Sequence, residues 1–95
     1  MAAYVLLDID VHDPLGYEKY KKAGAPTIIA YGGKPLARGG AVEVKEGDWQ
    51  PKRLVLLEFN TMEQAKRWWN SPEYQEAKKL RHRAAGASVI FFEGM

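Results

Sequence analysis

The sequence contains no cysteine among its 95 residues. Disulfide bonds, thiolate nucleophiles and cysteine-built metal sites are therefore excluded, and the absence is typical of a reducing cytosol. The first residues include no basic side chain and carry Asp8 and Asp10 where a signal peptide needs an apolar run. No apolar stretch approaches the roughly 20 residues that span a bilayer. We expect a cytoplasmic protein that does not enter a membrane.

Histidine is scarce as well, and His12 and His82 are the only two. Their spacing and the scattered carboxylates match neither a zinc site nor a non-haem iron site, and nothing favours a haem ligand. The sequence also lacks a glycine-rich phosphate loop, a nucleophile elbow and a Ser-His-Asp arrangement. We expect a protein that holds no metal and no other cofactor.

Net charge is small, because 14 Lys and Arg stand against 12 Asp and Glu to give +2 at pH 7. Such a balance does not indicate an acidic partner. The one local excess is the basic run from Lys78 to Arg83, in the last turns of a predicted helix. Cations there complement the helix dipole, so this run is interpreted as a solvated helix end.

The most informative stretch begins at Glu58-Phe59, where a strand ends and a helix follows. Thr61 and Gln64 have the spacing of a capping box, in which the Thr hydroxyl accepts from the Gln amide and the Gln side chain returns to the Thr N–H. The helix therefore begins at Met62. Ser71-Pro72 repeats a start signal, because proline fits the first helical position and excludes helical geometry from the residue before it. We expect two helical pieces that meet at a bend.

Four segments have the pattern of strands, over residues 4–11, 35–44, 53–59 and 88–93. The second is expected to bend at Gly39-Gly40, which invites a bulge. Between the first two strands, Asp13-Pro14 starts a helix, Gly24-Ala25-Pro26 disturbs it and Gly32-Gly33 ends its short continuation. In the first strand the alternation predicts two faces: Val5, Leu7, Ile9 and Val11 on one, and Tyr4, Leu6, Asp8 and Asp10 on the other.

This order predicts a single α+β domain over residues 1–95 with the ferredoxin-like βαββαβ plan, a four-stranded antiparallel sheet with two helices on one face. Both sheet faces are largely apolar. The second face has Tyr4, Leu6, Leu54 and Leu56, with either Ile90 and Phe92 or Val89 and Phe91. Two helices cover one face only, and soluble monomers rarely expose more than a few hundred Å² of contiguous apolar surface. The simplest cover is a second copy related by a two-fold axis, so we expect a homodimer.

The same strand order describes RNA-recognition domains, which stack bases on a basic, aromatic third strand. The third strand here reads Arg53-Leu-Val-Leu-Leu-Glu-Phe. Its open face would present leucines and a carboxylate, so we expect no nucleic-acid binding.

With these residues in view, the chain resembles, nearly end to end, a family of small bacterial domains of unknown function in the dimeric α/β-barrel superfamily. The resemblance implies a dimeric barrel but supplies no established activity. Other branches of the superfamily include cofactor-free oxygenases, small isomerases and haem enzymes, and kinship of fold does not transfer their chemistry. The residues that carry the resemblance are Tyr17, Tyr20, Ala25-Pro26, Tyr31-Gly32-Gly33, Leu36-Ala37-Arg38-Gly39-Gly40, Glu46-Gly47, Arg53, Glu58-Phe59, Ser71-Pro72-Glu73-Tyr74-Gln75, Arg81 and Glu93-Gly94.

Arg38 precedes Gly39-Gly40, where absent side chains would let backbone N–H groups form an anion or carbonyl site beside a guanidinium. The alternative is a structural ion pair between Arg38 and Asp8 or Glu58. These two carboxylates belong to the face assigned to the barrel interior. There each would pair with a cation or act as a general base with a raised pKa.

Three further residues complete the candidate ligand site: Tyr17, Trp49 and Arg53. Trp49 is either a lid over a pocket or a packing anchor at the dimer rim. The first functional hypothesis is a cofactor-independent enzyme or binder of a small polar or aromatic carbonyl compound. The alternative is a non-catalytic dimeric structural or interaction module, and the sequence leaves open whether the protein is an enzyme.

Overall fold

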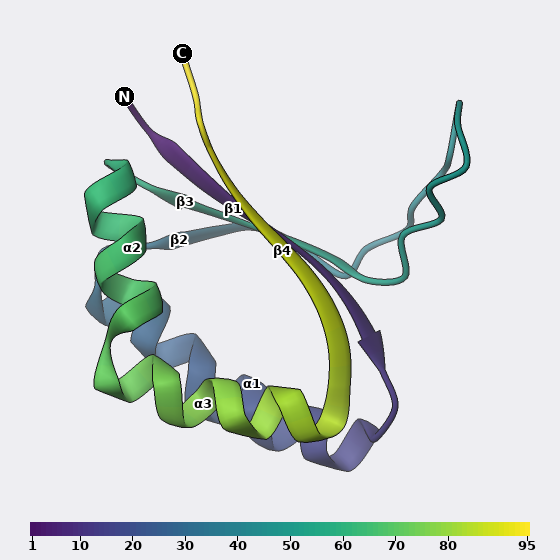
Figure 1. Cartoon of the computed structure of the whole chain (residues 1–95), viewed down its shortest axis with the longest axis horizontal. Coiled ribbons are helices and arrows are strands. Elements are labelled where there is room, and N and C mark those ends of the chain that lie inside the picture. The colour runs from purple at the N-terminus through teal and green to yellow at the C-terminus, as the bar shows by residue number, and fades with distance from the viewer.

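A computed structural model describes all 95 residues as one four-stranded sheet with three helices (Figure 1). The strands pair antiparallel in the order β2-β3-β1-β4, and the helices lie together on one face of the sheet. The predicted α+β class and antiparallel sheet are confirmed. No helix has the length and apolar character that crossing a membrane requires. The elements are β1 (Ala3–Val11), α1 (Pro14–Ala30), β2 (Lys34–Arg38), β3 (Leu54–Phe59), α2 (Met62–Asn70), α3 (Pro72–Ala84) and β4 (Ala85–Glu93).

The core lies between the sheet and the helices. The predicted alternation of β1 is observed, since every second residue from Ala3 to Ile9 is buried toward the helices. Trp68 of α2 occupies the centre of the aromatic part of the core, with its ring centroid 5.5 Å from that of Phe59 and 4.2 Å from that of Tyr74. All three of these aromatic side chains are fully buried, so they fix α2 and α3 against the sheet.

The two start signals of the helical stretch act as predicted, with one difference. The hydroxyl of Thr61 accepts from the Gln64 N–H at 3.1 Å, and the hydroxyl of Ser71 accepts from the Tyr74 N–H at 3.1 Å. The Gln64 side chain does not return to Thr61, as a full capping box requires. It donates to the carbonyl of Tyr31 at 2.8 Å and so ties the end of α1 to α2.

Helix α1 is continuous through Pro26, whereas the sequence predicted a disturbance there. Proline has a helical φ, but it removes the hydrogen bond to the carbonyl four residues earlier and crowds that carbonyl. That carbonyl belongs to Lys22, which is exposed, so water can replace the missing donor. The helix ends before Gly32, whose φ of 81° is the expected left-handed conformation.

The predicted second strand was too long, because β2 ends at Arg38 and not at Val44. Gly39 has a φ of 63°, a conformation that carries the chain out of the sheet. The bulge predicted at Gly39-Gly40 lies instead between Pro35 and Ala37. Smaller differences are that β3 begins at Leu54 and not at Arg53, and that β4 begins at Ala85 and not at Ser88.

The sheet face opposite the helices is open and apolar. In β4, Ile90 pairs with Leu6 and Phe92 with Tyr4, so these two residues of β4, and not Val89 and Phe91, belong to this face. Ile90 is 56% exposed and Phe92 is 42% exposed. We call this surface the open face; its residues are Tyr4, Leu6, Asp8, Leu54, Leu56, Glu58, Ile90 and Phe92.

Residues 40–52, here called the arm, connect β2 to β3 and project beyond the sheet on the side away from the helices (Figure 1). The carboxylate of Asp8 fixes the root of the arm. It accepts from the Trp49 indole N–H at 3.0 Å and from the Lys52 backbone N–H at 2.9 Å. Partial loss of water acts to raise the pKa of Asp8, but these hydrogen bonds outweigh it and lower the pKa below its ordinary value.

A buried hydrogen-bond chain joins α1 to α2 and gives the first prediction. The Trp68 indole N–H donates to the Thr27 hydroxyl at 3.0 Å, and this hydroxyl donates to the Gly24 carbonyl at 2.6 Å. Thr27→Val removes the acceptor and leaves the indole N–H unpaired in the core, so we expect the free energy of unfolding to fall by ~1–3 kcal/mol. Thr27→Ser keeps the hydroxyl and is the control. Denaturant titrations with equal midpoints for the two variants would contradict this account.

The second prediction concerns the pH dependence of the arm. The lowered pKa of Asp8 means that its hydrogen bonds favour the ionised carboxylate, so their contribution is present at neutral pH and is lost as the pH falls below 3.8 through the folded-state pKa. We expect the fluorescence of Trp49, obtained by subtracting the spectrum of a Trp49→Phe variant, to change in that range. Far-UV circular dichroism, measured in parallel, monitors the fold as a whole. Asp8→Asn should abolish the transition. A transition of the same size in Asp8→Asn would show that another group anchors the arm.

Candidate functional site

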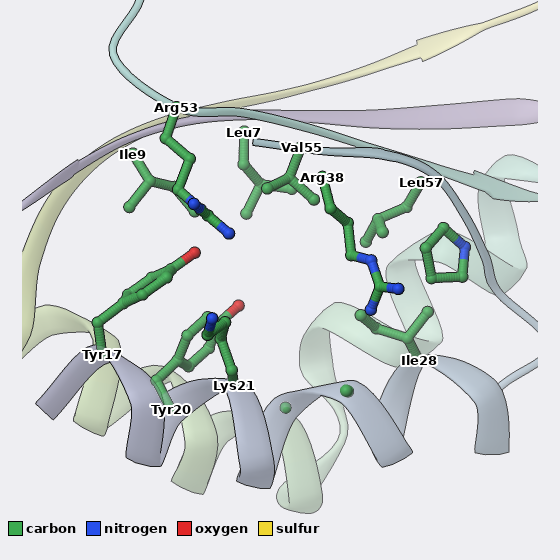
Figure 2. A pocket seen from close by; sticks show the side chains of 13 residues that line it. Leu7, Ile9, Tyr17, Tyr20, Lys21, Ile28, Arg38, Arg53, Val55 and Leu57 are labelled. Carbon is green, nitrogen blue, oxygen red and sulfur yellow. The ribbon is translucent and has the colours of Figure 1, made fainter. Parts of the chain in front are cut away.

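A cavity of about 80 Å³ lies between the sheet and α1 (Figure 2). Its walls are mainly apolar, and the side chains that form them come from the helix-facing side of three strands and from the inner side of α1. The principal apolar lining residues are Leu7, Ile9, Ile28, Pro35, Val55 and Leu57.

Two arginines from opposite ends of the arm enter this cavity. Arg38 pairs with Val55 in the sheet, and the Arg53 carbonyl accepts from the Ile9 N–H at 2.9 Å, so both side chains take the helix-facing side. Figure 2 shows both guanidinium groups extending from the sheet into the space above α1. The cavity therefore carries positive charge at the end of the sheet next to the arm.

The bulge in β2 decides the direction of Arg38. Pro35 pairs with Leu57 and Ala37 with Leu56, which leaves Leu36 without a partner in β3. In an unbroken register Arg38 would pair with Leu54 and share the open face with Asp8, because facing alternates with a period of two. The extra residue reverses that alternation and turns Arg38 toward α1.

Arg53 is held by packing more than by hydrogen bonds. Its Cζ lies 5.4 Å from the ring centroid of Tyr17, and its Nε is buried without a hydrogen-bond partner. Gly39 packs directly against it, since a Cβ on Gly39 would lie 2.6 Å from the Arg53 Cζ. The Gly39 N–H already donates to the Leu54 carbonyl at 2.8 Å, so it is not free for a ligand.

The third cation of the cavity, Lys21, is neutralised within its own helix. Its Nζ lies 2.8 Å from the Glu18 carboxylate, and this hydrogen bond lowers the pKa of Glu18 below its ordinary value. The other two ion pairs of the chain also join lysine to glutamate, so none involves Arg38 or Arg53. Neither guanidinium group has a carboxylate within ion-pair distance, although the charge of Arg53 also contributes to the lowered pKa of Glu18.

Two tyrosines of α1 supply hydroxyl groups to the cavity. The rings of Tyr17 and Tyr20 lie 5.5 Å apart, and the Tyr20 and Tyr74 hydroxyls share a hydrogen bond of 3.1 Å. Burial, followed by the interaction with Tyr74, raises the pKa of Tyr20. Tyr20 therefore keeps its proton at neutral pH and offers a neutral hydroxyl.

The structure separates the predicted site residues into two groups. Arg38, Arg53 and Tyr17 meet in the cavity. Asp8 and Glu58 lie on the open face, where Asp8 holds the arm and the Glu58 carboxylate raises the pKa of Tyr4. The alternative ion pair between Arg38 and either carboxylate is absent, because the sheet lies between them.

The remaining candidates lie in or beside the arm. Gly40 has no atom within 4 Å of its Cβ position, and Trp49 is 57% exposed and is not part of the cavity lining. Sequence reasoning missed Lys21 as a cavity residue and treated Tyr20 only as packing. Lys21 follows Tyr17 by four residues, so helical spacing could have placed both on one face.

The chain has no group of three or more His, Asp or Glu side chains that could hold a metal ion. His12 and His82 are both exposed and do not line the cavity. What the cavity offers is therefore positive charge, tyrosine hydroxyls and apolar walls.

Three solved structures show the same fold. A protein of unknown function from Rhodopseudomonas palustris is 18% identical, with a TM-score of 0.72 over 99% of this chain and 82% of that one. A dimeric ferredoxin-like protein of unknown function from Thermobifida fusca is 14% identical, with a TM-score of 0.69 over 99% and 92%. SnoaB, a cofactor-independent oxygenase from Streptomyces nogalater, is 13% identical, with a TM-score of 0.68 over 99% and 92%. At these identities the likeness shows the fold alone.

No curated protein matches the sequence. Residues 2–95 match the family described as a domain of unknown function, DUF1330. The match spans almost the whole chain and agrees with the family resemblance seen in the sequence. The chain belongs to the DUF1330 family, whose function is unknown.

Proposed function

We propose that the protein binds a small organic anion with an aromatic or other apolar body in the cavity between the sheet and α1. The observation that carries this proposal is that Arg38 and Arg53 share a largely apolar cavity in which neither forms an ion pair with a carboxylate. Arg38 is exposed and Arg53 is half-buried, so partial loss of hydration, mainly at Arg53, favours an ionic partner. An anionic ligand would supply the missing partner.

The geometry limits the size and shape of the ligand. A guanidinium group binds a carboxylate or enolate through two parallel N–H bonds. The hydroxyls of Tyr17 and Tyr20 can bind a further ligand oxygen. The cavity of about 80 Å³ is far below the roughly 300 Å³ at which drug-sized pockets begin, so it suits a compact acid.

A second candidate is a cofactor-independent enzyme acting on a carbonyl compound. The same two cations would stabilise a bound enolate or phenolate and lower the pKa of the substrate acid. The neighbour SnoaB is described as a cofactor-independent oxygenase, which supports this candidate by fold analogy only. Proton exchange at the central carbon of a small enolisable dicarbonyl compound in D₂O, followed by NMR, tests it. Exchange rates equal for wild type and Arg53→Met would exclude this activity.

We also propose that the protein is a homodimer that buries the open face, with a dimeric α/β barrel as the result. The open face is apolar and no helix covers it. Two of the similar structures are described as dimeric proteins with a ferredoxin-like fold. A second copy packed by a two-fold axis covers both open faces at once.

The third prediction tests the anion site with benzoate and its neutral isostere benzamide. We expect wild type to bind benzoate in preference to benzamide, and Arg53→Met and Arg38→Met each to weaken benzoate binding about tenfold or more, which is ~1.4 kcal/mol. Methionine keeps much of the apolar stem and removes the charge. Calorimetry measures the affinities, and Arg83→Met, which removes an exposed cation elsewhere, is the control. Equal binding of benzoate and benzamide would refute charge recognition.

The fourth prediction tests the dimer. Light scattering after size exclusion should give about twice the chain mass of 10.7 kDa. Leu56→Glu places a second carboxylate beside Glu58 on the open face and should give a monomer, whereas Leu15→Glu, at a position that is 78% exposed on α1, should stay dimeric. A wild-type monomer that remains soluble at micromolar concentration without binding hydrophobic dyes would exclude the barrel.

A further inference from the structure

We propose that the arm clasps a second copy of the chain, and that its docking there positions Arg38 and Arg53 for ligand binding. The inference rests on the homodimer proposed above and extends it, because the cavity then depends on the partner copy. A second copy could cover the open face without touching the arm. The proposal that the arm clasps that copy must therefore be argued from the arm itself.

The arm carries the pattern of a strand but has no partner within its own chain. Residues 41–45 read Ala-Val-Glu-Val-Lys, an alternation typical of a strand with one apolar face. Val42 is 40% exposed and Val44 is 46% exposed. No backbone-to-backbone hydrogen bond forms within residues 40–52 or from them to the sheet. Unpaired strand backbone beside exposed valines is a ready site for pairing with another chain.

The direction of the arm indicates which chain that is. The arm projects on the open-face side of the sheet (Figure 1), and its root is fixed there by Asp8, which is an open-face residue. A second copy seated on the open face must therefore pass beside the arm. In a two-fold dimer the contact is reciprocal, so each arm reaches the other copy.

The total surface of the chain is larger than that of a compact monomer. A monomeric protein of 10.7 kDa is expected to expose about 5,500 Å², and the 6265 Å² of this chain exceed that by about 760 Å². The excess measures how far the chain departs from a compact shape, and the extended arm is the part that departs most (Figure 1).

The arm is linked to the cavity through its two roots, since Arg38 directly precedes Gly39 and Arg53 directly follows residue 52. Gly39 touches the Arg53 guanidinium, and its N–H is bonded to the Leu54 carbonyl at 2.8 Å. A displacement of the arm root therefore moves the surface on which Arg53 rests. Because linkage is reciprocal, a ligand that orders the two arginines must also strengthen the dimer.

The fifth prediction compares two double variants by analytical ultracentrifugation. Val42→Ser/Val44→Ser removes the apolar face of the arm, and Leu15→Ser/Ile29→Ser removes two exposed apolar side chains of α1, which are 78% and 63% exposed. We expect the first to weaken the dimer at least tenfold and the second to leave its dissociation constant unchanged. Equal dissociation constants for the arm variant and wild type would overturn the clasp.

A cross-linking measurement covers the case in which the arm variant is unstable. Since the chain has no cysteine, a benzophenone maleimide attached to Val44→Cys reports on the arm alone. In a mixture of ¹⁵N-labelled and unlabelled protein, we expect cross-linked peptides that combine the two isotopes. Cross-links confined to single chains at a concentration where the protein is dimeric would also overturn the clasp.

The linkage to the cavity is tested with benzoate as the probe. Saturating benzoate should lower the dimer dissociation constant of wild type, and the arm variant should bind benzoate more weakly than wild type. Benzoate that binds both proteins equally would overturn the linkage and leave the anion site standing. Absence of benzoate binding to wild type would overturn the linkage together with the anion site, while the clasp is decided by centrifugation and cross-linking.

Discussion

At the bulge between Pro35 and Ala37, Leu36 has no partner in β3. The residues of β2 that follow it therefore point to the opposite face of the sheet from the one an unbroken register would give them. Without it, Arg38 would lie on the same face as Asp8 and Glu58, and pairing with one of them would satisfy its charge. With it, both carboxylates stay on the open face and Arg38 joins Arg53 beside α1. A one-residue irregularity at a sheet edge thus places Arg38 across the sheet from Asp8 and Glu58 and adds a second guanidinium group to the cavity.

The chain tolerates these unpaired cations partly through aromatic rings. Only two buried side-chain nitrogen or oxygen atoms lack a hydrogen-bond partner, the Nε atoms of Arg53 and Arg81. Arg53 lies 5.4 Å from the ring of Tyr17, and Arg81 lies 5.9 Å from that of Tyr20. A ring face attracts a cation without neutralising it. The tyrosine pair therefore holds the guanidinium groups of Arg53 and Arg81 in place without neutralising them, whereas Arg38 is exposed to water.

Patterns among neighbouring residues predicted most of the fold. The site depends on the register between strands, which such patterns do not encode. The alternation of β1 and the helix starts at Thr61 and Ser71 depend on residues close together in the chain. The two-residue period of a strand and the chemistry of helix caps therefore predicted them. The direction of Arg38 depends on the register between β2 and β3, which one residue reverses and no local pattern reveals. Tyr17, Arg38 and Arg53, which the sequence grouped as ligand-site candidates, line one cavity, and the absence of the alternative ion pair of Arg38 follows from the bulge.

The position of the carboxylates also constrains any catalysis. A general base must come within hydrogen-bond reach of the proton it removes, and the cavity lining includes neither a carboxylate nor an imidazole. Asp8, predicted as a base, has a lowered pKa and is occupied by Trp49 and Lys52, so it is a weak base committed to the arm. A substrate of this cavity would therefore have to be acidic enough to lose its proton to water once the two guanidinium groups stabilise its anion. Phenols and enolisable dicarbonyl compounds meet that condition, whereas simple ketones bound here would remain ligands.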